Sequence, residues 1–297
     1  MLTDLNDYSI GIEDVLKEHF DEENIVYWMA FQILMGNVDT QNRNVYLYSP
    51  LNSDIWYFIA WDNDGCLMRS EYELKNFSDQ GSWEKGISNY WGNVLFQRCL
   101  KSRSFREKLN DAILELREYL NKDMLISKIE SYKNVLKPYL YSMPDAEYEP
   151  LTSEQYDQIV ASLPDEIEKN YKLYLESLET PMPFYIGVPT IDGNKLKFNW
   201  DVSYDLDAED ITYSVEVARD YLFQDVIYHN TTLTVPETEM DLPEAGQYFV
   251  RIRATNTSGK TQDAFDYYVT DEGKHYGMKC FYITEDSTVE EDNYEEG

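Results

Sequence analysis

The sequence predicts a multidomain protein, with a mainly α-helical first domain that contains a β-hairpin and an all-β second domain. Up to about residue 178, apolar residues recur at the three- and four-residue steps of a helix face. The Pro-rich segment Thr180–Pro183 then indicates a linker. Beyond it, short alternating runs are separated by Asp-, Gly- and Pro-rich turns, as in a β-sandwich. We therefore expect a helical lobe over residues 1–179, a sandwich over 180–272 and an acidic tail over 273–297.

The composition indicates a folded and strongly acidic protein. Of the 297 residues, 43% are hydrophobic and 15% are aromatic, which is enough to build a core. The formal net charge is −31 at pH 7, and a field of that sign repels nucleic-acid backbones and anionic membranes. We therefore expect no nucleic-acid partner, and a bound nucleotide would need divalent cations to offset the repulsion.

Cysteine and histidine spacing predicts no metal site. The three cysteines form no Cys-x-x-Cys pair, and the three histidines lie in separate regions without metal-ligand spacing. These residues are Cys66, Cys99, Cys280, His19, His229 and His275. No apolar run reaches the roughly 18 residues of a membrane span, and no basic-then-apolar segment opens the chain. We therefore expect neither a membrane span nor a signal peptide here, and a natural protein that is longer than this chain.

The clearest single helix is predicted after Asp21. Asp21 can cap its first turn, and the helix should run to about Met35, because Gly36 suits the left-handed position that ends helices. A shorter helix should precede it and end near His19. The longer helix is apolar on almost every side, so we expect it to be buried as a central post beneath the following loop.

Further helices are predicted between Trp83 and Leu178. Thr152 and Gln155 have the spacing of a capping box, and Pro164 should break or restart the last helix. Two apolar stripes run along these helices, and we expect both to be core: Phe105, Leu109, Ile113, Leu116 and Leu120, then Leu125, Ile129, Tyr132, Leu136 and Leu140.

The most informative feature is a set of carboxylates and amides around a predicted hairpin. Asp39 and Asn44 stand five positions apart in a loop, and two strands follow, at Asn44–Tyr48 and Ile55–Trp61. Asp62 and Asp64 come directly after the second strand. Because residues two apart in an extended chain point the same way, these two carboxylates should converge if the strand continues.

Phosphoryl transfer uses such a set. One carboxylate orients a hydroxyl nucleophile, while an amide and further carboxylates hold magnesium on the phosphates. Protein kinases have an Asp and an Asn at the same spacing in their catalytic loop. The alternative is ordinary turn chemistry, because Asp and Asn favour turns whatever their function.

The residue pattern of these segments resembles that of the spore-coat protein H (CotH) family of atypical kinases. The family's Gly-Asn-x-Asp loop, with its downstream Asn, is matched by Gly36–Asn44. Its Tyr-Leu-Tyr strand is matched by Tyr46–Tyr48, and its Trp-Asp-x-Asp-Gly turn by Trp61–Gly65. The resemblance covers about residues 15–178 and implies a kinase-like C-lobe.

The resemblance also implies roles for individual residues. Asp39 would be the catalytic carboxylate, Asn44 and Asp62 would bind the cofactor, and Asn44, Asp62 and Asp64 would bind the metal. The cofactors would be Mg²⁺ and ATP, and the acceptor a Ser or Thr of a bacterial surface or coat protein. A kinase site also needs a Lys on an upstream strand and commonly a glycine-rich flap. We find neither in the 38 residues before Asp39, so we expect activity in a longer parent protein and not in this chain alone.

The second domain resembles a fibronectin type III module. Leu242–Asn256 matches the latter half of such a module, with Tyr248 at the tyrosine-corner position, and Trp200 matches the buried Trp of an early strand. Such modules are spacers or adhesive platforms, which favours a cell-surface or secreted protein. Residues 285–297 are acidic without a basic residue, and we expect them to be disordered.

Two other functions remain open from the sequence. One is a non-catalytic cell-surface scaffold or adhesion protein that contacts polysaccharide or an envelope protein. The other is a hydrolase that pairs two carboxylates, such as Asp39 and Asp62, across a sugar cleft.

Overall fold

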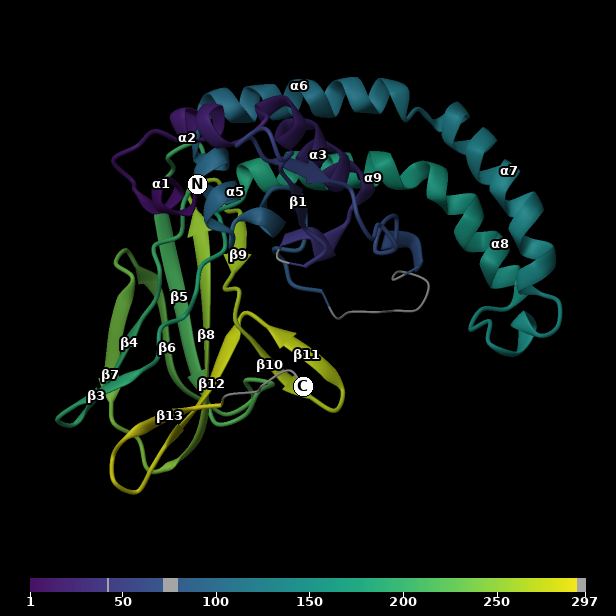
Figure 1. Ribbon diagram of the computed structural model, residues 1–297. Helices are drawn as coiled ribbons and strands as arrows, with labels where there is room; N and C mark the ends of the chain where they lie inside the picture. Colours follow the sequence, from purple (N-terminus) through teal and green to yellow (C-terminus); the bar gives the residue numbers. More distant parts are fainter. Residues whose placement is uncertain (42, 72–79, 293–297) are drawn as a thin grey trace. The chain divides into compact units, whose positions relative to one another are not determined.

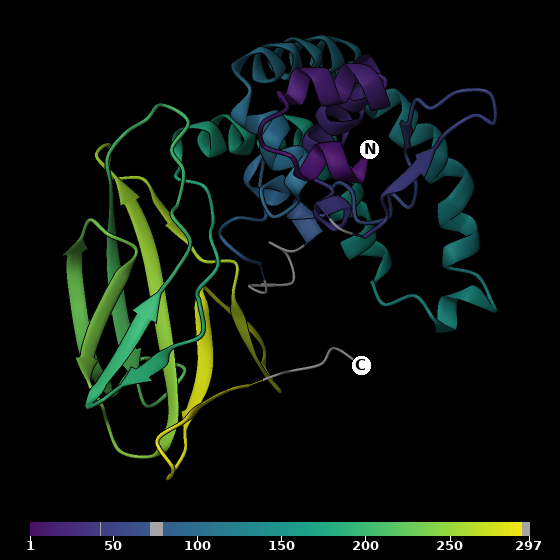
Figure 2. The ribbon, with the colours of Figure 1, turned by 60° about the vertical axis from the view of Figure 1, so that its left-hand side comes forward.

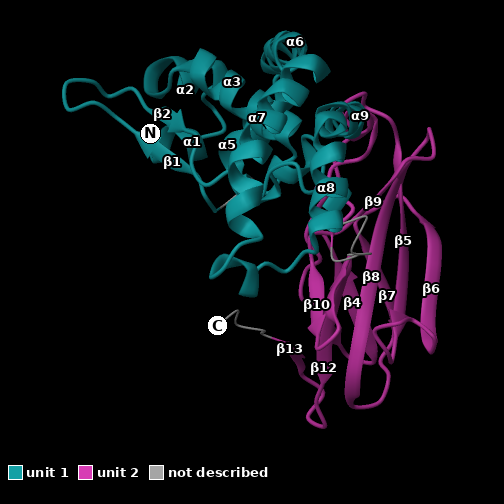
Figure 3. Cartoon of the chain, turned by 90° about the vertical axis from the view of Figure 1, so that its right-hand side faces the viewer, with its two compact units in different colours: residues 1–77, 85–175 teal, residues 78–84, 176–297 magenta. Residues whose placement is uncertain are grey.

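The computed structural model describes residues 1–41, 43–71 and 80–292 (Figure 1). The chain divides into two compact units: residues 1–77 with 85–175 form unit 1, and residues 78–84 with 176–297 form unit 2 (Figure 3). The division falls inside the last helix, α9 (Glu166–Glu179), close to the predicted domain boundary. The prediction of a helix from Trp83 is wrong at its start. Trp83 belongs to unit 2, where its ring centroid lies 5.0 Å from that of Phe265.

Unit 1 is helical and contains one short hairpin. Its helices are α1 (Leu2–Asn6), α2 (Ile12–His19), α3 (Glu22–Met35), α5 (Val94–Lys101), α6 (Arg103–Tyr119), α7 (Lys122–Leu140), α8 (Ser153–Ser162) and most of α9. Short 3-10 turns are η1 (Val38–Gln41), η2 (Ser88–Tyr90), η3 (Asp145–Glu147) and η4 (Leu163–Asp165). The hairpin consists of β1 (Tyr46–Tyr48) and β2 (Tyr57–Ile59).

Helix α3 begins and ends where the sequence predicts. The Asp21 carboxylate accepts a hydrogen bond of 2.9 Å from the Asn24 N–H, which satisfies one of the free donors at the helix start. Gly36 ends the helix in the left-handed conformation, with φ of 64°. The helix is buried almost throughout and packs against α6 and β2, so the prediction of a central post is confirmed.

The hairpin is shorter than predicted, and only one of its side chains is deeply buried. Tyr46, Leu47 and Tyr48 pair with Ile59, Phe58 and Tyr57 in an antiparallel register. Phe58 is 4% exposed, and its ring lies 4.8 Å from that of Trp28 on α3. Because β2 ends at Ile59, the extended chain does not continue to Asp62 and Asp64, as the convergence argument had assumed.

The two predicted apolar stripes differ in their outcome. Phe105, Leu109 and Ile113 of α6 are buried, as expected for the face that packs on α3. Tyr132 and Leu136 of α7 are 62% and 51% exposed, so the prediction that this second stripe is core is wrong. Helices α7 and α8 extend away from α3 (Figure 1), and α7 packs mainly on the turns η3 and η4 on either side of α8.

The capping box of α8 forms as the sequence predicts. The Thr152 side chain accepts from the Gln155 N–H, and the Gln155 side chain accepts from the Thr152 N–H. Pro164 lies in the single turn η4, which separates α8 from α9. Among the helices of the described ranges, none combines the length and the apolar character that crossing a membrane requires.

Unit 2 is formed by antiparallel sheets around a shared core (Figure 2). A six-stranded sheet has the order β13-β12-β8-β5-β6, with β9 paired to β8, and a three-stranded sheet has the order β3-β4-β7. Val215, Val250 and Ile252 from the larger sheet and Leu196 and Phe198 from the smaller one are at most 1% exposed. The strands are β3 (Thr190–Asp192), β4 (Lys195–Asn199), β5 (Ile211–Ala218), β6 (Val226–Leu233), β7 (Glu237–Asp241), β8 (Gly246–Asn256), β9 (Thr261–Asp263), β10 (Tyr267–Thr270), β11 (Gly273–Tyr276), β12 (Met278–Ile283) and β13 (Val289–Glu291).

The expectation of an acidic tail from residue 273 is corrected by three of these strands. Strand β11 pairs with β10, β12 pairs with β8, and β13 pairs with β12. Phe281 of β12 is fully buried, because alternate residues of this strand face the core. The acidic residues of this segment begin only at Glu285, so the apolar positions of β12 lie before the acidic part of the predicted tail. Residues 293–297 of the predicted tail lie outside the described residues, as does Asn42 of the Asp39–Asn44 loop.

Candidate functional site

The loop that carries Asp39 starts from the end of α3. The Gly36 N–H donates to the Ile33 carbonyl and the Asn37 N–H to the Gln32 carbonyl, both at 3.1 Å, which is a Schellman motif. A Cβ atom on Gly36 would lie 2.6 Å from the Asn170 side chain of α9, and its φ of 64° is one that side chains rarely adopt, so glycine is strongly favoured here. Asn170 in turn donates to the Leu34 carbonyl at 3.0 Å. The direction in which the loop leaves the helix is therefore fixed by backbone and side chain together.

Buried polar side chains stabilise the loop through hydrogen bonds. Thr40 is fully buried, and its hydroxyl lies 3.0 Å from the Tyr90 hydroxyl and donates to the Asn37 carbonyl at 3.2 Å. Asn89 donates to the Val38 carbonyl at 3.3 Å. The Asp39 N–H donates to the Asn37 side-chain oxygen at 3.3 Å, while Asp39 itself faces solvent. The loop thus presents one exposed carboxylate on a backbone that is bonded from within.

The turn that carries Asp62 and Asp64 is joined to the same helix end. Asp62 has φ of 50°, a left-handed value that turns the chain after the hairpin. The Asn63 side-chain oxygen accepts from Gln32 at 3.2 Å and from Asn37 at 3.4 Å. Further on, the Leu67 N–H donates to the Met35 carbonyl at 2.8 Å. Helix α3 therefore supports both the loop and the turn.

The three aspartates lie close enough to affect one another. A Cβ atom on Gly65 would lie 3.2 Å from an Asp39 carboxylate oxygen, so this carboxylate lies against the turn. The negative charge of Asp64 is the largest cause that raises the pKa of Asp62, and the charge of Asp39 acts in the same direction. Burial, followed by the charges of Asp64 and Asp39, raises the pKa of the neighbouring Cys66 thiol to about 12. Negative charge is thus concentrated at one exposed surface.

The four predicted site residues do not all converge on one point. The ligand oxygens of Asp39, Asp62 and Asp64, all of them described residues, do not all lie within 4.8 Å of one another. Asn44 has φ of 53°, and within residues 1–41, 43–71 and 80–292 no hydrogen bond joins its side chain to these aspartates. The structure therefore brings three carboxylates to one surface, and the role of each residue stays a prediction.

Sequence reasoning missed the amides that support this site. Gln32 and Asn37 are at most 2% exposed and are joined by a hydrogen bond of 3.0 Å. A signal was present, because Gln32 is a single amide in the apolar second half of α3. A buried amide needs partners, and here the partners are the loop and the turn.

A comparison with known protein families identifies the family of this chain. The family described as "CotH kinase protein" matches residues 1–174. The chain belongs to the CotH kinase family. The matched region contains Asp39, Asn44, Asp62 and Asp64, as the sequence resemblance implied. No curated protein matches this CotH chain.

Two solved structures show distant likeness to this CotH protein. One is the "Twitchin kinase region from C.elegans", at 17% identity over 32% of this chain and 19% of that chain, with a TM-score of 0.23. The other is surface layer protein SbsC, domains 1-6, at 13% identity over 92% and 38% of the two chains, with a TM-score of 0.17. At these TM-scores, neither likeness describes the fold of the CotH chain.

Proposed function

We propose that this chain carries the metal-binding and acceptor-binding part of a CotH-type protein kinase. The reaction would transfer the terminal phosphoryl group of Mg·ATP to a Ser or Thr hydroxyl of a bacterial surface or coat protein. The observation that supports it best is the meeting of Asp39 with the Asp62–Asp64 turn at one exposed surface. The buried amides of Gln32 and Asn37 add support, because their hydrogen bonds to each other and to Asn63 join the loop to the turn.

The donor set fits a magnesium ion. Asp62 and Asp64 supply hard carboxylate oxygens, and Asn44 would add an amide oxygen, which is the ligand chemistry that Mg²⁺ prefers. The mutual repulsion that raises the pKa of Asp62 is the kind of strain that a bound dication relieves. When bound, the ion would offset charge on the phosphates. Asp39 would orient the acceptor hydroxyl and accept its proton.

We further propose that the chain alone binds Mg²⁺ weakly, binds ATP weakly or not at all, and is inactive. The described elements that end before Asp39 are the helices α1, α2 and α3, and none of them is a strand that could carry a phosphate-binding Lys. A cation for the phosphates would therefore have to come from outside these three helices. Transfer would then depend on that cation.

Unit 2 is proposed to be a fibronectin type III-like module of a cell-surface or secreted protein. Two observations support this proposal. The Tyr248 hydroxyl donates to the Glu244 carbonyl at 2.8 Å, and Trp200 is 5% exposed in the shared core. Both are features of such sandwiches. The module would act as a spacer or as a contact surface for an envelope protein or polysaccharide.

Calorimetry with Mg²⁺, with and without ATP, tests the metal assignment. Asp62→Asn should abolish the weak Mg²⁺ signal, because it removes a ligand charge. Asp54→Asn is the matched control, since Asp54 is also an exposed aspartate of the hairpin region but lies before β2. Binding that Asp62→Asn leaves intact would refute the metal site.

A radiolabel assay tests the proposal of inactivity separately. The chain alone should transfer no label from ATP to a mixed Ser/Thr peptide substrate or to itself. Transfer that Asp39→Asn abolishes would support the kinase site and refute inactivity. Absence of both Mg²⁺ binding and transfer would favour the non-catalytic scaffold.

A further inference from the structure

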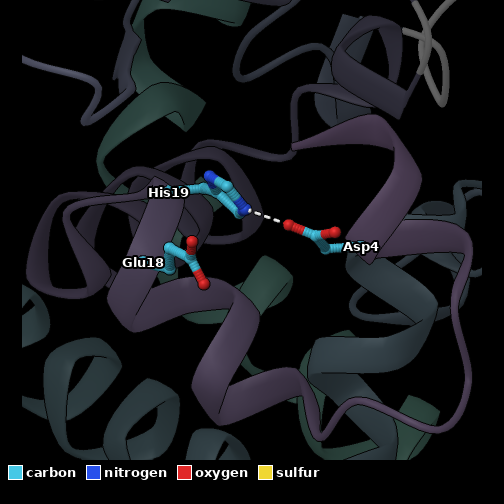
Figure 4. Close-up of side chains that lie close together, drawn as sticks. All are labelled: Asp4, Glu18 and His19. Atoms are coloured by element: carbon cyan, nitrogen blue, oxygen red, sulfur yellow. Dashed lines mark hydrogen bonds and ion pairs between the residues drawn. The ribbon is translucent and has the colours of Figure 1, made fainter.

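A second group of ligand-type side chains lies where α1 meets the end of α2 (Figure 4). One ligand atom from each of Asp4, Glu18 and His19 lies within 4.8 Å of the other two. The His19 Nε2 atom is 2.7 Å from a carboxylate oxygen of Asp4. The Glu18 carboxylate lies beside this pair in Figure 4, and its residue is exposed to solvent.

The backbone that carries these side chains is held on both sides. The His19 carbonyl accepts from the Trp56 N–H at 2.8 Å, which ties the end of α2 to the segment before β2. The Asp4 carbonyl accepts from the Arg98 guanidinium at 3.2 Å, and Arg98 is only 7% exposed. The positions of Asp4 and His19 therefore do not depend on the contact between their side chains alone.

We propose that Asp4, Glu18 and His19 form a binding site for a divalent transition-metal ion of the Zn²⁺ type. An imidazole nitrogen with two carboxylate oxygens suits zinc, whereas Mg²⁺ and Ca²⁺ favour oxygen ligands throughout. Zinc bonds of about 2.0–2.2 Å place tetrahedral ligands roughly 3.3–3.5 Å apart. The His19 and Asp4 atoms would separate slightly, the Glu18 carboxylate would close in, and a water would take the open side.

The local charge favours a dication. The two carboxylates supply two negative charges when His19 is neutral, so a bound Zn²⁺ would be balanced. The nearby Arg98 guanidinium is positive, but it is directed at the backbone carbonyls of Asp4, Leu5, Asp7 and Ile10. The net charge of −31 on the whole chain also attracts cations.

The simpler explanation is an ion pair that joins α1 to α2. The Asp4–His19 contact alone would serve that purpose, with side chains 34% and 13% exposed. Glu18 would then have no part in it. Glu18 therefore separates the two explanations, and because it is exposed, its substitution should leave the fold intact.

Isothermal calorimetry with Zn²⁺ alone tests the site. The wild-type chain should bind one ion with high occupancy at the N-terminal cluster. Loss of an outer-shell partner already costs roughly 10–100-fold in metal affinity, so loss of the direct ligand in Glu18→Gln should cost at least about tenfold. Asp14→Asn, which removes an exposed charge one turn earlier on α2, should change affinity far less. His19→Gln should abolish binding.

Two further measurements distinguish a metal ion bound at this site from one bound at Cys66 or at the kinase site. Co²⁺ bound at Asp4, Glu18 and His19 should show no thiolate charge-transfer band, since all ligands are nitrogen and oxygen. Asp62→Asn should leave the Zn²⁺ affinity unchanged, whatever it does to Mg²⁺. The proposal is overturned if no ion binds, if Glu18→Gln binds Zn²⁺ as tightly as the wild type, or if the Co²⁺ spectrum shows a thiolate ligand.

Discussion

The loop that carries Asp39 and the turn that carries Asp62 and Asp64 meet at one surface but are held in different ways. The loop rests on the buried side chains of Thr40, Tyr90 and Asn89. The turn is exposed, is joined to α3 mainly through Asn63, and places like charges side by side. The backbone beside the proposed catalytic carboxylate is thus held by buried hydrogen bonds, whereas the proposed metal ligands lie on an exposed turn where like charges repel.

The largest expected effect comes from removing the support of the loop. Tyr90 is 1% exposed, so Tyr90→Ala should cost about 3–5 kcal/mol of the free energy of unfolding, as for other large aromatic truncations. Tyr90→Phe keeps the ring and removes only the hydroxyl bonded to Thr40, so it should cost about 1 kcal/mol. Urea unfolding followed by circular dichroism measures both. Equal effects of the two variants would contradict the view that ring packing dominates.

A smaller loss is expected where the loop leaves α3. Gly36→Ala forces a side chain into a left-handed conformation, which costs about 1–2 kcal/mol, and overpacking against Asn170 adds roughly 1–3 kcal/mol. Gly193→Ala is the matched control. Its φ of 61° is similar, but a Cβ atom there would meet nothing within 4 Å. Thermal unfolding should therefore show a clearly larger loss for Gly36→Ala, and equal losses would exclude the collision with Asn170.

The smallest effect is expected at Asn63, which links the loop to the turn. Asn63→Ala removes the acceptor of Gln32 and Asn37, and should cost about 0.5–1.5 kcal/mol. Hydrogen exchange should become faster at the Leu67 N–H, which follows the turn and bonds to the Met35 carbonyl, and stay unchanged at the Asp39 N–H. Asn52→Ala, at an exposed position between the hairpin strands, should change neither. Faster exchange at Asp39 as well would mean that loop and turn are one unit.

Local rules predicted the elements of unit 1 that depend on neighbouring residues. The cap at Asp21, the left-handed Gly36 and the capping box at Thr152 all involve groups within a few residues of each other. The hairpin and the buried α3 followed from local turn and apolar patterns. The stripe of Leu136 on α7 was misjudged, because helical periodicity indicates an apolar face but does not supply the neighbour that would cover it.

The residue patterns of the sequence were enough to predict the CotH family and the helical and β-rich parts, while the roles of the four candidate site residues stay predictions. The tertiary structure alone decided which side chains from distant positions share a surface. Asp4 reaches His19 only because α1 folds back on α2, and Gln32 reaches Asn63 only because the hairpin returns to α3. The physical reason is that spacing along the chain governs contacts within one helix or strand, whereas contacts between elements depend on how their buried faces pack.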